Sequence, residues 1–183
     1  MCYFYCDFRD TGKQDVRGLL SSLVAQLCAK SDSCYNILSD LYSAHDVGSQ
    51  QPDDEELAEC LKKMLKLPEQ PTMYIIVDGL DECPNTSGLP TAREKVLDLL
   101  EDLVSLKLQN LRICVTSRPE IDIKIVLEPL TSLRVSLHDE NGQKSDIRDY
   151  VSSVVHSDRK MRRWRAEDKQ LVIDTLCAKV NGM

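Results

Sequence analysis

The most constraining feature of this sequence is an unbroken apolar run, Thr72 to Val77, that ends abruptly at Asp78 and Gly79. Such a run, preceded by Pro71 and followed by a turn dipeptide, is typical of a buried β-strand. Because apolar residues occupy both alternating sets of positions, we expect the strand to be covered on both faces, as in a parallel sheet between helices.

Other apolar runs alternate with helical patterns along most of the chain. The expected strands are Tyr3–Phe8, Thr72–Val77, Leu111–Val115 and, more weakly buried, Leu133–Leu137. The expected helices are about Gln14–Ala29, Ser33–Ala44, a helix that Asp53 caps and that ends before Pro68, a helix through Val96–Val104, and Pro119–Leu127. Strands that alternate with helices predict parallel pairing through right-handed crossovers. Ligands of such sheets bind at the carboxyl ends of the strands, so the residues that follow each run are the candidate site.

From Gln143 onward the sequence shows helical patterns and no further strand. We therefore expect an α/β part in residues 1–137 and an all-helical part in residues 138–183. The basic segment Arg159–Arg165 surrounds Trp164, a combination that can contact nucleic acid or phosphate. Because the chain as a whole is acidic, we interpret the segment instead as a solvated turn between two helices, with Trp164 packed into the helical part.

The composition excludes several classes of protein. The chain has 183 residues, of which 42% are hydrophobic and 29% charged, as in ordinary globular domains. A net charge of −7 argues against nucleic acid or an anionic membrane as the main partner, because both recruit excess Lys and Arg. No apolar run approaches the roughly 18 residues that cross a bilayer.

The eight cysteines are best interpreted as reduced thiols. Residues 1–10 lack the basic and apolar regions of a secretory signal, no C-x-x-C pair occurs, and several cysteines fall within apolar periodic segments. This pattern predicts a cytoplasmic protein without structural zinc.

Three carboxylates, Asp78, Asp81 and Glu82, directly follow the Thr72–Val77 strand. Packed like charges raise one another's pKa unless a cation neutralises them, and Mg²⁺ prefers oxygen ligands. Gly79 leaves space beside the first carboxylate for a phosphate or the metal's waters. The alternative is an acidic turn that only caps the strand.

Thr116 and Arg118 follow the Leu111–Val115 strand. If the two strands are neighbours, Arg118 stands beside the acidic cluster and can donate a fork of hydrogen bonds to a phosphate. A salt bridge from Arg118 to one of the three carboxylates explains the arginine equally well. Together, the acidic cluster and the arginine favour a phosphate site.

These two segments carry a family resemblance. Tyr74-Ile75-Ile76-Val77-Asp78-Gly79-Leu80-Asp81-Glu82 resembles the Walker B segment of NACHT domains, in the STAND class of signalling NTPases, and Ile113-Cys114-Val115-Thr116-Ser117-Arg118-Pro119 resembles their sensor 1 segment. The opening Tyr3–Phe8 and the helix after it resemble the nephrocystin-like N-terminal group common in fungal NACHT proteins. Asp146–Val151 and the terminal Asn181-Gly182-Met183 resemble the start of that group's helical lid.

The resemblance implies a role for each candidate residue. Asp78 would hold Mg²⁺ through water, and Glu82 or Asp81 would orient or deprotonate the attacking water. Arg118 would sense the γ-phosphate of ATP, with Thr116 beside it in the nucleotide-binding segment. Such groups position the reactants and neutralise charge, as phosphoryl transfer requires.

The phosphate-binding loop of this class, G-x-x-x-x-G-K-[ST], does not occur in the 183 residues. The Gly12-Lys13 pair has Asp7 where the first glycine belongs and Gln14 where the hydroxyl residue belongs. We therefore expect a fragment: an incomplete parallel-sheet P-loop NTPase core, followed by the start of an α-helical lid. By the resemblance, the missing strand would lie between the sensor 1 strand and Leu133–Leu137, and its absence would leave a gap or a collapsed pairing there, with exposed strand edges prone to association.

Three functions remain open from the sequence. The first is part of an ATP-dependent signalling switch, whose partners are nucleotide and other protein domains or copies of itself, and which lacks turnover when alone. The second is a non-catalytic protein-interaction module. The third is a Mg²⁺-dependent phosphohydrolase or nuclease that uses the three carboxylates by themselves.

Overall fold

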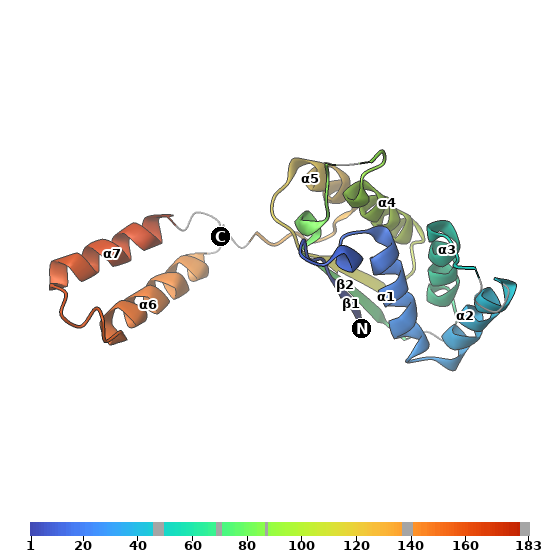
Figure 1. Ribbon diagram of the computed structural model, residues 1–183, viewed down its shortest axis with the longest axis horizontal. Coiled ribbons are helices and arrows are strands. Elements are labelled where there is room, and N and C mark those ends of the chain that lie inside the picture. Colours follow the sequence, from blue (N-terminus) through green and yellow to red (C-terminus); the bar gives the residue numbers. More distant parts are fainter. Residues whose placement is uncertain (46–49, 69–70, 87, 137–140, 180–183) are drawn as a thin grey trace. The chain divides into compact units, whose positions relative to one another are not determined.

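The computed structural model describes residues 1–45, 50–68, 71–86, 88–136 and 141–179. The chain separates into two compact units, Met1–Thr131 and Ser132–Met183 (Figure 1). The division falls a few residues before the boundary at 137/138 expected from the sequence, which itself lies outside the described residues.

The first unit is built on a three-stranded parallel sheet with strand order β1-β2-β3. Its strands are β1 (Cys2–Tyr5), β2 (Met73–Asp78) and β3 (Leu111–Val115). In the ladder, Phe4 lies opposite Val77 on one side and Val77 lies opposite Val115 on the other. The parallel pairing predicted from the alternating pattern is confirmed for these three strands.

The first strand is shorter than the predicted Tyr3–Phe8. The Cys6 N–H still donates to the Asp78 carbonyl at 2.9 Å, but the next N–H, of Asp7, donates to the Lys13 carbonyl at 3.2 Å. The Phe8 N–H donates to the Glu82 carboxylate at 3.1 Å. The chain therefore leaves the ladder after Cys6 because local and side-chain acceptors replace the neighbouring strand.

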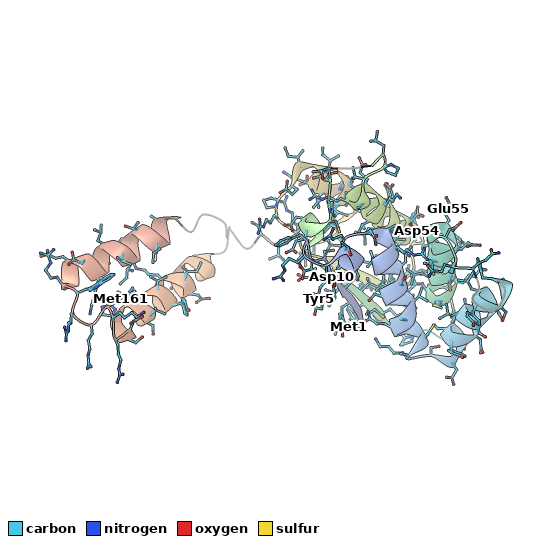
Figure 2. The ribbon with its side chains drawn as sticks, viewed as in Figure 1. Met1, Tyr5, Asp10, Asp54, Glu55 and Met161 are labelled. Carbon is cyan, nitrogen blue, oxygen red and sulfur yellow. The ribbon has the colours of Figure 1, made fainter. Side chains whose placement is uncertain are left out.

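The helices of the first unit follow the apolar periodicity. They are α1 (Val16–Cys28), α2 (Asp32–Ala44), α3 (Asp54–Leu65), α4 (Ala92–Ser105) and α5 (Ile121–Leu127). The predicted cap of α3 is confirmed: the Asp53 side chain accepts from the Glu56 N–H, and the Glu56 side chain accepts from the Asp53 N–H. Asp54 and Glu55 follow in the first turn (Figure 2), where negative charge complements the helix dipole.

The expectation that the central strand is covered on both faces is wrong for the described residues. Met73, Ile75 and Val77 are buried in a core shared with α1, α3 and α4, but Tyr74 on the opposite face is 52% exposed. The neighbouring strand repeats the alternation with buried Phe4 and exposed tyrosines. The physical reason is that the described helices bury only one face, while the tyrosine hydroxyls tolerate water on the other.

The weak strand predicted at Leu133–Leu137 is also wrong for Leu133–Ser136, which have no strand structure; Leu137 lies outside the described residues. Leu133 and Val135 are 78% and 63% exposed. A strand forms only when a neighbouring strand accepts and donates its backbone hydrogen bonds. Within the described sheet β3 pairs with β2, and no strand pairs with Leu133–Ser136. The alternation of apolar and polar residues was therefore insufficient to predict a strand here.

The second unit contains a helical hairpin, α6 (Asn141–Ser157) and α7 (Ala166–Lys179) (Figure 1). Val155 and Ile173 are buried, and Arg148 pairs with Asp174 at 2.8 Å. Met161 lies in the connection between the helices (Figure 2), within the basic segment expected to be a turn.

The described residues thus form a mixed α/β protein with seven α-helices and a small parallel sheet. None of the helices in these residues combines the length and the apolar character that spanning a bilayer requires.

Candidate functional site

The acidic segment and the Thr116–Arg118 segment meet at the carboxyl edge of the sheet. Val77 and Val115 are register partners, so the residues that follow them emerge side by side. The Thr116 N–H donates to the Val77 carbonyl at 2.9 Å, and the Leu80 N–H donates to the Thr116 carbonyl at 3.0 Å. The predicted adjacency of the two segments is confirmed.

The Thr116 hydroxyl links the two strand ends directly. It donates to Asp78 Oδ1 at 2.5 Å and accepts from the Gly79 N–H at 3.0 Å. A charge-assisted hydrogen bond of this kind fixes the orientation of the carboxylate. Carboxylate and hydroxyl oxygens are also the ligand types that suit Mg²⁺, so the chemistry of this pair fits the implied metal.

Gly79 turns the chain sharply after the strand. Its φ of 68° and ψ of 40° lie in the left-handed region, where an L side chain is strained. A Cβ there would lie 3.5 Å from the Cys6 carbonyl oxygen, which is ordinary contact. The glycine is therefore required by its backbone conformation more than by the space beside it. The turn leads into the 3-10 helix η3 (Leu80–Glu82), which the fully buried Leu80 anchors.

Asp81 and Arg118 form an ion pair. Arg118 Nε lies 3.5 Å from Asp81 Oδ2, and the Arg118 backbone N–H donates to Asp81 Oδ1 at 2.9 Å. The Asp81 side chain is 12% exposed, whereas that of Arg118 is 82% exposed. The salt bridge that the sequence left open is thus present, and the guanidinium remains largely in solvent.

Glu82 contacts the segment that follows β1. Its Oε2 accepts the Phe8 N–H at 3.1 Å. Asp7 in the same segment pairs with Arg9, and the hydrogen bonds from Arg9 lower the pKa of the Asp7 carboxyl to about 2. The sequence predicted that the residues after the first strand lie at this edge of the sheet, but it did not predict the contact between Phe8 and Glu82, because that contact depends on strand order.

The three carboxylates are therefore directed to three separate donors: Thr116, Arg118 and the Phe8 N–H. Within the described residues, no group of three or more His, Cys, Asp and Glu side chains is arranged to hold a metal ion. Asp78 is the one of the three that reaches the Thr116 hydroxyl.

Arg93 is a structural residue of the site that the sequence analysis missed. Its buried guanidinium donates to the Cys83 carbonyl at 3.0 Å, to the Asp81 carbonyl at 2.6 Å and to Asp122 at 3.1 Å. These contacts tie the acidic segment to α4 and α5. The helical pattern of the sequence could have identified it. Arg93 stands three residues before the buried Val96, so both lie on the apolar face of α4.

An open cavity of about 390 Å³ lies beside this network. Its lining includes Phe8, Asp81, Glu82, Arg93 and Arg118. It brings two guanidinium groups and two carboxylates to one surface, a set that can contact an anion and a cation together.

Two buried thiols lie next to the acidic segment, Cys83 directly after Glu82 in the sequence and Cys6 against it. Cys83 Sγ and Cys6 Sγ are 3.5 Å apart. The hydrogen bond with Cys6 and the positive charge of Arg93 lower the pKa of the Cys83 thiol. The same hydrogen bond, together with burial, raises the pKa of the Cys6 thiol.

The fold and the site define an α/β protein that presents an acidic segment and an arginine at the carboxyl edge of a parallel sheet. A family model described as "Nephrocystin 3, N-terminal" matches residues 1–118, and the chain belongs to this family. The match includes all three strands and every candidate site residue. No curated protein and no solved structure gave a significant match.

Proposed function

We propose that this chain forms the Mg²⁺-binding and γ-phosphate-sensing half of a NACHT-type switch domain in a STAND signalling NTPase, where ATP or ADP controls oligomerisation. The observation that carries the proposal is the Thr116–Asp78 hydrogen bond across two strand ends, at the sheet edge where such folds bind ligands. Membership of the nephrocystin 3 N-terminal family is consistent with it.

In this proposal, Asp78 holds Mg²⁺ through water while Thr116 orients its carboxylate. Bound Mg²⁺ neutralises charge on the nucleotide phosphates. Arg118 and Thr116 face the nucleotide, and Glu82 or Asp81 orients the attacking water. A phosphate competes with Asp81 for Arg118 at little expense, because an ion pair with an exposed arginine contributes only about 0–1 kcal/mol. Glu82 must likewise exchange the Phe8 N–H for water.

The phosphate-binding loop is supplied by other sequence in this proposal, since the 183 residues do not contain the motif. The chain alone therefore binds nucleotide weakly and turns it over at a negligible rate. Its partners are nucleotide and other protein domains or further copies, with neither nucleic acid nor membrane as a ligand. Its location is the cytoplasm, where thiols are reduced unless an oxidant is present.

The second candidate is a protein-interaction module without turnover. It is favoured by the open face of the sheet, where Tyr3, Tyr5 and Tyr74 are about half exposed and the rings of Tyr3 and Tyr5 lie 5.4 Å apart. Exposed tyrosines are enriched at protein interfaces. The third candidate, a hydrolase using three carboxylates alone, is less supported because those carboxylates are directed to separate donors.

The decisive experiment titrates Mg-ATP and Mg-ADP by calorimetry against this chain and against a longer polypeptide in which a phosphate-binding loop precedes Met1. We expect weak binding by the first and at least tenfold tighter, Mg²⁺-dependent binding by the second. Asp78→Asn and Arg118→Ala should weaken binding by the longer polypeptide, whereas Asp98→Asn and Arg112→Ala, on exposed positions away from the site, should not.

Two results would overturn the proposal. One is a longer polypeptide that binds no nucleotide although it is folded. The other is turnover by the 183-residue chain that Glu82→Ala abolishes, which would establish a complete hydrolytic site without the loop.

A further inference from the structure

Cys6 and Cys83 are the two residues of the first unit whose sulfur atoms meet across the candidate site. They are far apart in the sequence, yet their Sγ atoms lie 3.5 Å apart and both side chains are buried. Cys6 directly follows β1, and Cys83 directly follows Glu82. By contrast, Cys28 Sγ contacts the backbone carbonyl of Cys34, at 3.6 Å, and Cys114 is exposed.

We propose that Cys6 and Cys83 are a modification site: a peroxide oxidises them to an intramolecular disulfide that joins the segment after β1 to the acidic segment. A disulfide requires the sulfur atoms to approach to about 2.0 Å, a movement of roughly 1.5 Å from their present separation. Rotation of two neighbouring side chains supplies a movement of this size. Formation of the disulfide does not require a nucleotide, so it can be tested separately from the proposed function.

The cavity explains how the oxidant reaches a buried pair. Cys83 belongs to its lining, next to Glu82 and Arg93, but its side chain is 0% exposed, so hydrogen peroxide reaches the sulfur from that side only when the lining side chains move. The positive charge of Arg93 favours the Cys83 thiolate, and the thiolate is the nucleophilic form. Because Cys83 lines the cavity and Cys6 does not, Cys83 is the attacking sulfur and Cys6 the resolving sulfur.

The reaction balances with one peroxide. The Cys83 sulfur attacks a peroxide oxygen, the O–O bond breaks, and the released hydroxide takes the thiol proton to form water, which leaves a sulfenic acid. The Cys6 sulfur then attacks the Cys83 sulfur: an S–S bond forms, the S–O bond breaks, and the hydroxide leaves with the Cys6 proton as a second water. The two thiols lose two electrons and two protons, and the peroxide is reduced to two waters.

The disulfide would act on Glu82. It joins Cys83, which follows Glu82, to Cys6, which is two residues before Phe8. The disulfide would therefore lie next to both residues of the hydrogen bond from the Phe8 N–H to Glu82. Oxidation would then hold Glu82 on Phe8 and away from any water beside a nucleotide. This regulatory consequence, unlike the disulfide itself, depends on the proposed role of Glu82.

The test is peptide mapping of the whole chain after hydrogen peroxide, with free thiols blocked by an alkylating agent and digestion under non-reducing conditions. We expect a Cys6–Cys83 linked peptide that lacks two hydrogen atoms and that dithiothreitol separates. Cys6→Ala should abolish the link, while Cys114→Ser and Cys28→Ser, the exposed and the half-buried control, should leave its yield unchanged. Because the mapping is carried out on the unaltered chain, it does not depend on whether a buried variant folds.

Several outcomes would overturn the disulfide: an unoxidised pair when Cys114 is fully oxidised, a Cys83 that proceeds to sulfinic acid, or links only between separate chains. The regulatory consequence is tested separately, by Mg-ATP turnover of the longer polypeptide before and after oxidation. If the disulfide forms and turnover is unchanged, the effect on Glu82 is wrong. If the reduced polypeptide binds no nucleotide, the proposed function fails while the disulfide remains.

Discussion

Thr116 and Asp78 are joined by a 2.5 Å hydrogen bond between residues that follow two different strands of the sheet. The threonine hydroxyl also accepts the Gly79 N–H at 3.0 Å, so one side chain fixes both the carboxylate and the start of the turn. The candidate site is therefore a product of strand pairing.

Replacing Thr116 by valine removes the hydroxyl and preserves the side-chain shape. We expect Thr116→Val to lower the free energy of unfolding by about 1–2 kcal/mol, because Asp78 and the Gly79 N–H both lose a partner. Thr116→Ser, which retains the hydroxyl, should lower the free energy of unfolding by less. Urea denaturation measures both variants, and equal stability of the two would contradict the importance of the hydrogen bonds.

Gly79→Ala tests the left-handed turn. We expect a loss of about 1–2 kcal/mol, because alanine is strained at a φ of 68° although its Cβ would meet no close atom. Gly12→Ala is the matched control, since its Cβ also has an ordinary 3.5 Å contact and its φ lies outside the left-handed region. Thermal denaturation should separate the two, and a control as damaging as Gly79→Ala would refute the conformational explanation.

Arg93→Met should be the most destabilising of these changes. It leaves two carbonyls and the Asp122 carboxylate without their buried donor, and we expect a loss of about 3 kcal/mol. Arg112→Met, on an exposed arginine bonded to carbonyls near it in sequence, should change stability by less than about 0.5 kcal/mol. A double-mutant cycle with Asp122→Asn then measures the coupling of the buried pair, and an absence of coupling would show that the ion pair is unimportant.

Arg118→Ala should leave stability nearly unchanged. The guanidinium is 82% exposed, so loss of its pairing with Asp81 should change the free energy of unfolding by less than about 1 kcal/mol. Chemical denaturation tests this, and a larger loss would identify Arg118 as a structural residue. A stable variant would allow any loss of nucleotide binding to be assigned to the site itself.

His45 should make stability depend on pH. Its ring nitrogens lie 2.9 Å from the Leu41 carbonyl and 2.9 Å from Glu56, and these two acceptors raise the pKa of His45 above 6.5. Because the folded pKa exceeds the unfolded value, the stabilisation is complete below pH 6.5 and is lost as pH rises through the folded pKa. The Tm difference between the wild type and His45→Gln should therefore be larger at about pH 5.5 than at about pH 8.5. A Tm difference that increases with pH would show that folding lowers the pKa of His45 instead of raising it.

Elements with strong periodicity could be predicted from the sequence. The helix through Leu19, Leu20 and Leu23 and the strand Met73–Asp78, predicted as Thr72–Val77, follow from local spacing alone, because a repeated apolar face specifies which element can bury it. The strand expected at Leu133–Leu137 failed over its described part because alternation supplies no hydrogen-bond partner. The exposed face at Tyr74 was missed for a related reason: residue type does not specify whether another layer packs on it.

The order of residues along the chain was enough to locate the candidate site: Asp78, Asp81 and Glu82 follow one apolar run, and Thr116 and Arg118 follow another. Parallel strands place such residues at one edge, so this much follows from chain order. The partners of these residues are known from the folded chain alone: Asp78 contacts Thr116, Asp81 contacts Arg118, Glu82 contacts Phe8 and Cys83 contacts Cys6. Those pairings depend on strand order and on the turn at Gly79, which bring together side chains that no local pattern connects.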